Sequence, residues 1–286
     1  MLANFLKKTT VINYVLVSLL LVLYLFVIKP NFFQGFSYVI MILILVFANE
    51  ELGLVKFRPY FYIFLIQYFA LFPELLSQTA FLWSMMALIR MFRASQRNID
   101  DREVFFDMGF WLGLSVVFVP ETAVFLLYVL LEFFYSKRRF LNTFLALILG
   151  TIVPVFLFFT YQYINDEVWE YTWNFQLINF EQNQFRMIFV SSVIGLLIVH
   201  GLLIYQRVQN KLMSISNSKP IHVVGFMICS LMMLFTTANN TESVFVYFGF
   251  PWAVFISNYL SIQENSWYRE TLLLFLIVLP LILAYV

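Results

Sequence analysis

Eleven apolar runs follow one another along this chain, and they constrain its fold more than any other feature of the sequence. A helix needs roughly 20 apolar residues to cross the ~30 Å hydrocarbon core of a bilayer. Runs of this kind therefore predict an all-α, polytopic transmembrane helical bundle of about eleven spans, although the runs of 14 to 17 residues also suit hairpins that do not fully cross. The runs are 11–28, 33–48, 59–72, 75–89, 104–119, 122–135, 140–161, 185–205, 221–238, 244–260 and 271–286.

The composition agrees with a membrane protein. Hydrophobic residues make up 62% of the chain and charged residues 12%, about half the charge of an ordinary soluble domain. Eleven spans would occupy about 220 residues and leave no room for a separate soluble domain, so we expect a single transmembrane domain over 1–286. The first run follows Lys7 and Lys8 and has no small-residue cleavage site after it, so we interpret it as a retained span.

The distribution of cations predicts the orientation. With a cytoplasmic N-terminus and alternating spans, only Lys29 and Arg186 fall outside, and the other fifteen of the seventeen Lys and Arg residues fall inside. Enrichment of Lys and Arg in short cytoplasmic loops sets the orientation of membrane proteins. The inner set is Lys7, Lys8, Lys56, Arg58, Arg90, Arg93, Arg97, Arg102, Lys137, Arg138, Arg139, Arg207, Lys211, Lys219 and Arg269.

A short motif recurs between pairs of runs. Leu71-Phe72-Pro73-Glu74 corresponds to Phe118-Val119-Pro120-Glu121 at an offset of 47 residues, and each copy leads into a run that ends in cations, at Arg90 and Arg93 or at 137–139. Proline suits the first position of a helix, and a glutamate in the first turn faces the positive end of the helix dipole. We therefore predict two tight outer turns, each starting a new helix. The segments 56–93 and 103–140 are either repeated helical hairpins or a chance match of two short motifs.

One long outer segment, 162–184, carries four acidic residues and no Lys or Arg. Trp169, Trp173, Leu177 and Phe180 recur in it at helical spacing. This pattern predicts an interfacial helix in the headgroup layer with its aromatic side chains toward the acyl chains. The alternative is a segment that packs over the mouth of a cavity.

The outer face also carries the candidate site residues. Glu74, Glu121 and Glu242 are the candidate catalytic carboxylates, and Arg186 is the candidate contact for a substrate phosphate. Glu242 lies in a polar turn with Asn239, Asn240 and Thr241, whose side chains suit a sugar. The competing interpretation assigns all of these residues to helix caps and solvated turns.

The sequence gives little support for metal, cofactor, nucleic-acid or transport chemistry. The sequence has no nucleotide-binding, zinc or hydrolase motif, and Cys229 is its single cysteine, so we expect no metal, no cofactor and no nucleic-acid partner. Small residues at Gly109, Gly113, Ala146 and Gly150 predict close helix approach in the fifth and seventh runs. Prolines such as Pro154 are expected to interrupt their helices, but no membrane-embedded carboxylates accompany them, which weakens a transporter hypothesis.

Three stretches carry a resemblance to a known family. They are Val11-Ile12-Asn13-Tyr14, Phe106-Asp107-Met108-Gly109-Phe110-Trp111-Leu112-Gly113-Leu114 with Pro120 after it, and Phe250-Pro251-Trp252-Ala253-Val254-Phe255-Ile256-Ser257-Asn258-Tyr259. They resemble an uncharacterised family of bacterial multi-pass inner-membrane proteins. That family is similar in layout to membrane glycosyltransferases that use polyprenyl-phosphate sugars, which place an acidic motif in their first outer loop. The corresponding loop here, 29–35, contains no acidic residue.

Three functions follow as hypotheses. The first is a cell-envelope protein of the inner membrane that handles a polyprenyl-linked sugar at the outer face; whether it is an enzyme stays open. The second is a non-catalytic membrane subunit or scaffold of an envelope complex, bound to other membrane proteins. The third is a transporter for an uncharged or lipidic solute. The lipid bilayer is the expected surrounding in all three.

Overall fold

The computed structural model describes residues 11–28, 39–40, 43, 58–71, 75–96, 101–135, 140–165, 195, 219–236, 246–262 and 265–283. Within these residues the chain is helical and has no strand, which confirms the all-α class. Nine of the eleven apolar runs coincide with a described helix, whereas the outer segment beyond residue 165 and runs 33–48 and 185–205, apart from 39–40, 43 and 195, lie outside the described residues. The number of spans and their orientation stay predictions.

Contacts divide the chain into two compact units. Unit 1 comprises Met1–Pro73, Asn179–Pro220 and Phe248–Val286, and unit 2 comprises Glu74–Ile178 and Ile221–Tyr247. Each unit is therefore built from segments that are distant in the sequence. The prediction of a single transmembrane domain over 1–286 is not tested by this division.

Helix α4 (Arg58–Leu71) is the centre of unit 1. It contacts α2 (Val11–Ile28), α12 (Gly249–Ile262) and α13 (Ser266–Leu283). Its residues from Phe61 to Ile66 are all buried, so every face of this stretch is covered. A helix that is apolar all round belongs inside a bundle. Phe61 meets Phe250 of α12 edge to face, with ring centroids 6.1 Å apart.

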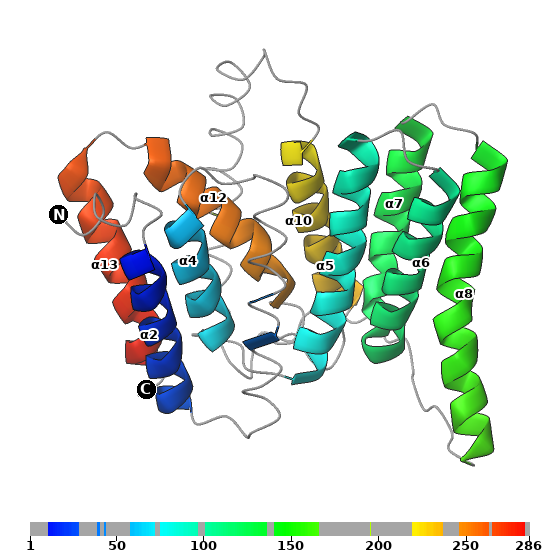
Figure 1. The fold of residues 1–286 in the computed structure, drawn as a ribbon, viewed down its shortest axis with the longest axis horizontal. Coiled ribbons are helices and arrows are strands. Elements are labelled where there is room, and N and C mark those ends of the chain that lie inside the picture. Colours follow the sequence, from blue (N-terminus) through cyan, green and yellow to red (C-terminus); the bar gives the residue numbers. More distant parts are fainter. Residues whose placement is uncertain are drawn as a thin grey trace. The chain divides into compact units, whose positions relative to one another are not determined.

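Unit 2 contains α5 (Leu75–Gln96), α6 (Asp101–Phe118), α7 (Val124–Tyr135), α8 (Phe140–Ile164) and α10 (Lys219–Thr236). Helix α6 lies between α5 and α8 and packs extensively against both (Figure 1). On the α5 side, the Trp83 and Trp111 rings stack in parallel with centroids 5.2 Å apart. Arg90 and Asp107 form an ion pair between the same two helices, at 3.2 Å.

Glycines allow α6 and α8 to touch backbone to backbone. A Cβ atom at Gly109 would collide with the Leu147 carbonyl oxygen, and one at Gly150 would collide with the Phe106 carbonyl oxygen. A Cβ atom at Gly113 would lie 2.6 Å from both the Thr151 carbonyl oxygen and the Pro154 ring. The prediction of close helix approach is confirmed for these three glycines.

Two expectations about helix ends need correction. Pro154 does not interrupt α8, which continues to Ile164, and the Pro154 ring occupies the space left by Gly113 of α6. Helix α5 continues past the predicted end of its run at 89 to Gln96, through Arg90 and Arg93. An apolar run predicts only the part of a helix that lies in an apolar environment. The helix can extend beyond the run, because long cationic side chains in its last turns reach water.

The turn between α6 and α7 forms as predicted. Val119 is extended, with φ −138° and ψ 94°, and Pro120 opens the 3-10 helix η1 (Pro120–Ala123), which continues into α7. Glu121 lies in the first turn of η1. The other copy of the motif fits the same plan, because α4 ends at Leu71 and α5 begins at Leu75, but 72–74 lie outside the described residues.

Candidate functional site

Only one of the predicted site residues lies in the described part of the chain. Glu121 is described, and its surroundings are defined. The remaining predicted residues lie outside the described residues, so their convergence on one site stays a prediction. They are Glu74, Arg186, Asn239, Asn240, Thr241 and Glu242.

Glu121 is part of the protein core. Its exposed fraction is 8%, and its neighbours Pro120 and Thr122 are also buried. The Thr122 hydroxyl donates to the Val119 carbonyl oxygen at 2.7 Å, which fixes the start of η1. Among the described residues, no cation pairs with the Glu121 carboxylate. Glu121 is therefore buried at the start of a helix, and the choice between a binding site and helix caps with solvated turns for the whole set of residues stays open.

Two buried serines on α5 and α6 form a hydrogen-bonded pair. Ser84 of α5 and Ser115 of α6 are both buried, and their hydroxyl oxygens are 2.8 Å apart. The Ser115 hydroxyl donates to the Ala80 carbonyl oxygen at 2.8 Å, and the Ser84 hydroxyl lies 3.2 Å from the same oxygen. This pair joins α5 to α6 at a depth where the surrounding side chains are apolar.

Tyr247 brings a third hydroxyl to this place. The residue belongs to the 3-10 helix η2 (Val246–Phe248), and its exposed fraction is 0%. Its ring packs against Phe81 and Phe125, with centroid distances of 5.5 and 5.7 Å. The Ser115 and Ser84 hydroxyls and the Glu121 carboxylate act on its hydroxyl.

These four side chains define the buried polar cluster of unit 2: Glu121, Tyr247, Ser84 and Ser115. Sequence reasoning selected Glu121 and missed the other three. Serines are common in apolar helices, and Tyr247 sits in an apolar run, so neither stands out without the packing. The only available signal was the repeated Pro-Glu motif, which points to the turn that carries Glu121.

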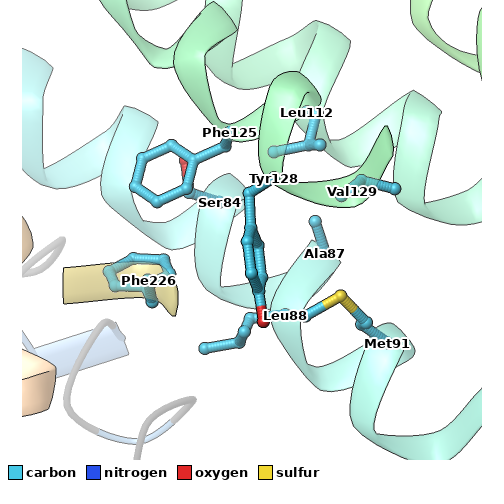
Figure 2. A pocket seen from close by; sticks show the side chains of 9 residues that line it. All are labelled: Ser84, Ala87, Leu88, Met91, Leu112, Phe125, Tyr128, Val129 and Phe226. Carbon is cyan, nitrogen blue, oxygen red and sulfur yellow. The ribbon is translucent and has the colours of Figure 1, made fainter. Parts of the chain in front are cut away.

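A small cavity adjoins the cluster at Ser84. Its volume is about 10 Å³, the space of about one water molecule. In Figure 2 the Tyr128 ring lies in the middle of the lining, between Phe226 and Val129. The Tyr128 ring also packs on Gly225 of α10, where an added Cβ would collide with it. Apart from Ser84 and Tyr128 the lining is apolar, so this cavity cannot admit a sugar or a phosphate as it stands.

The described residues offer no metal centre. No three of their His, Cys, Asp and Glu side chains lie close enough together to share an ion. Cys229 is buried in α10 with its sulfur 4.0 Å from the Val124 carbonyl oxygen.

The family of the chain is established by comparison. A model of the DUF6427 family, a family of unknown function, matches residues 1–286, so the chain belongs to that family. The predicted membership of an uncharacterised family is confirmed. No curated protein and no solved structure matches the chain.

Proposed function

We propose that this chain is a multi-pass membrane protein that serves as a non-catalytic helical subunit of a membrane complex. The observation that carries the membrane part is the surface of α8. Of the helices within the described residues, it is the one long and apolar enough to cross a bilayer, over Leu141–Ile164. Its bulky exposed side chains include Leu141, Leu145, Ile148, Leu149, Ile152, Val153, Phe156 and Leu157.

Exposing these apolar side chains to water would be unfavourable, whereas exposing them to lipid would not. Large contiguous apolar patches are rare on soluble monomers and mark membrane or partner contacts. With a rise of about 1.5 Å per residue, a helix of this length extends beyond the ~30 Å apolar core. On its other face, Gly150 lies against the backbone of α6, and Gly109 of α6 lies against the backbone of α8. We infer that lipid solvates the face that α6 leaves open.

The ends of α8 support the predicted orientation. Lys137, Arg138 and Arg139 come directly before it in the sequence, and cytoplasmic loops are enriched in such cations. At the other end, Tyr161 and Tyr163 are exposed. Exposed tyrosines suit the interfacial belt of a membrane protein. We therefore place residue 140 at the cytoplasmic side and residue 164 at the outer side.

Labelling of single cysteines tests this placement. In a Cys229→Ala background we expect Tyr163→Cys to react with a membrane-impermeant maleimide in intact cells. Lys137→Cys should react only after permeabilisation, and both variants should stay in the membrane pellet after carbonate extraction. Equal labelling of the two positions in intact cells, or recovery of the chain in the soluble fraction, would refute the placement.

Among the described residues of unit 2, the packing around Ser84 supports a structural role. The cavity at Ser84 has room for about one water molecule, and Glu121 faces the core beside Tyr247. A site for a lipid-linked sugar needs a cavity of several hundred Å³ that opens toward the membrane. The expected partner is another membrane protein whose helices pack against this chain.

Handling of a lipid-linked sugar at the outer face is the second candidate. The observation in its favour is the Glu121 carboxylate, which is buried at the predicted outer turn without a described cation. A carboxylate in such surroundings suits general-base chemistry if Glu74, Glu242 and Arg186 join it. This candidate rests on residues beyond the described ranges.

Deletion of the gene separates the two candidates. If the chain handles a lipid-linked sugar, the deletion strain should accumulate that lipid, and Glu121→Gln should reproduce the accumulation at normal protein levels. If the chain is a subunit, the lipid profile should stay unchanged. A membrane protein should then co-purify with the chain at a fixed ratio in mild detergent and lose stability in the deletion strain.

A further inference from the structure

One face of α6 changes from charged to apolar along its length. Five side chains at helical spacing define this face, and each is at least partly exposed: Glu103, Asp107, Phe110, Leu114 and Phe118. The two carboxylates lie near the start of the helix, whereas the three apolar side chains follow toward its end. A phospholipid has the same order of groups, with a charged head followed by apolar chains.

The charged end of this face carries an ion pair that is open to a ligand. Arg90 Nε of α5 lies 3.2 Å from Asp107 Oδ2, and the two side chains are 38% and 39% exposed. A guanidinium has five N–H donors and a carboxylate has two acceptor oxygens, so this contact uses only part of their capacity. The pair therefore presents a positive and a negative group side by side.

Two stacked tryptophans lie next to the ion pair. Trp111 follows Asp107 by one turn, about 6 Å along α6. Its ring stacks on Trp83 of α5, with centroids 5.2 Å apart and an interplanar angle of 9°. Tryptophan rings are enriched at the boundary between lipid headgroups and acyl chains. The stacked pair thus suits this boundary, with the ion pair at headgroup level.

We propose that the seam of α5 and α6 binds a zwitterionic glycerophospholipid whose headgroup carries a primary amine. Arg90 donates to the lipid phosphate, Asp107 accepts from the ammonium group, and an acyl chain lies along Phe110, Leu114 and Phe118. Phe118 follows Asp107 by eleven residues, about 16 Å, which is half of the ~30 Å apolar core and therefore the depth of one leaflet. This site rests on the proposed membrane location, with its headgroup in the leaflet at the predicted cytoplasmic side.

The two charges of the pair predict a preference among headgroups. An ethanolamine headgroup offers an anion to Arg90 and an N–H donor to Asp107. A choline headgroup keeps the positive charge but has no N–H group, so the hydrogen bond to Asp107 is lost. A glycerol headgroup has no cation at all, so the Asp107 carboxylate lies near the lipid phosphate without compensation.

Native mass spectrometry of the full chain in mild detergent measures this preference. The probes are phosphatidylethanolamine, phosphatidylcholine and phosphatidylglycerol with identical acyl chains. We expect the Kd of the ethanolamine lipid to be about fivefold lower than that of the choline lipid, the effect of one partly exposed hydrogen bond to a charged group. The glycerol lipid should bind most weakly. Equal Kd values for the three lipids would overturn the proposal.

Substitutions locate the preference. Asp107→Asn should abolish the difference between the ethanolamine and choline lipids, and Arg90→Gln should weaken binding of both about fivefold. Glu270→Gln is the matched control, because it removes a carboxylate from α13 in unit 1, and the preference should persist. A ratio of Kd values is insensitive to a general loss of stability. A preference that survives Asp107→Asn would overturn the proposal.

Photocrosslinking in cells identifies what covers this face. A benzophenone amino acid at Leu114 should crosslink to lipid, whereas one at buried Leu112 should crosslink within the chain. Crosslinking of position 114 to one partner protein would overturn the proposal. Carbonate extraction separates this failure from that of the membrane location. A chain that stays in the membrane pellet without headgroup preference refutes the lipid site alone, whereas a chain in the soluble fraction refutes both.

Discussion

Replacing Gly150 with alanine should push α6 and α8 apart. A methyl group at this position would collide with the Phe106 carbonyl oxygen and lie 3.0 Å from the Phe110 backbone nitrogen. Both atoms belong to the backbone of α6, so no side-chain rotation can relieve the contact. The helices must separate, and the packing along their whole interface must loosen.

The expected cost follows from two opposing terms. Overpacking of a close interface costs about 1–3 kcal/mol, and the upper end applies here because backbone atoms must move. Alanine recovers about 1 kcal/mol of helix propensity relative to glycine. The net loss of stability is therefore about 2 kcal/mol, which corresponds to a fall in Tm of about 4–8 °C.

A thermal melt of the purified chain in detergent measures this change. Gly195→Ala is the matched control, because a methyl group there meets no described atom within 4 Å, and its Tm should stay the same or rise slightly. Gly109→Ala should destabilise like Gly150→Ala, since its methyl group would meet the Leu147 carbonyl oxygen. The double variant should lose less than the sum, because the first methyl already separates the helices. A Gly150→Ala melt at or above the wild-type Tm would refute the reasoning.

Three further changes test other parts of the fold. The side chains of Arg90 and Asp107 are 38% and 39% exposed. A double-mutant cycle of Arg90→Ala and Asp107→Ala should therefore give a coupling free energy of only about 0.2–1 kcal/mol, which decreases with added salt. A larger coupling that does not depend on salt would contradict this expectation. Asn265 accepts a hydrogen bond from the Trp267 backbone nitrogen at 3.1 Å, so Asn265→Ala should cost about 1 kcal/mol in a denaturation titration, and Asn265→Asp should retain most of that stability. Leu149→Lys on the exposed face of α8 should lower the yield of membrane-inserted protein, because a lysine at mid-bilayer costs about 2.5–3.5 kcal/mol; normal insertion would argue against lipid contact at this position.

The sequence predicted the helices well because apolar runs and helix-ending residues such as proline determine secondary structure through local interactions. Pro120 ends one helix and opens the next through its own ring, and that effect needs no knowledge of the rest of the fold. Gly109 and Gly150 were recognisable for a similar reason, since small residues at this spacing are tolerated wherever two helices meet. The start of α13 was missed, because the hydropathy of its first turn is low while Asn265 caps it.

The candidate site was less accessible to sequence reasoning. Tyr247 and Ser84 are far apart in the chain and meet only through the packing of η2 against α5. The burial of Glu121 could not be read from the sequence either, because a glutamate that follows proline at a turn suits water equally well. Long-range contacts decide both points, and a single sequence carries no direct record of them.

The two faces of α8 connect the packing of unit 2 with the proposed location in a membrane. One face carries Gly150 and Thr151 and fits against α6 backbone to backbone, with Pro154 seated on Gly113. The opposite face carries large aliphatic and aromatic side chains that are exposed among the described residues. In water, the hydrophobic effect would drive that second face into contact with other apolar surface, whereas in a bilayer acyl chains solvate it at no such cost. Tight packing on one face and bulky exposure on the other is the arrangement that a membrane requires of a helix at the edge of a bundle, and α8 has both.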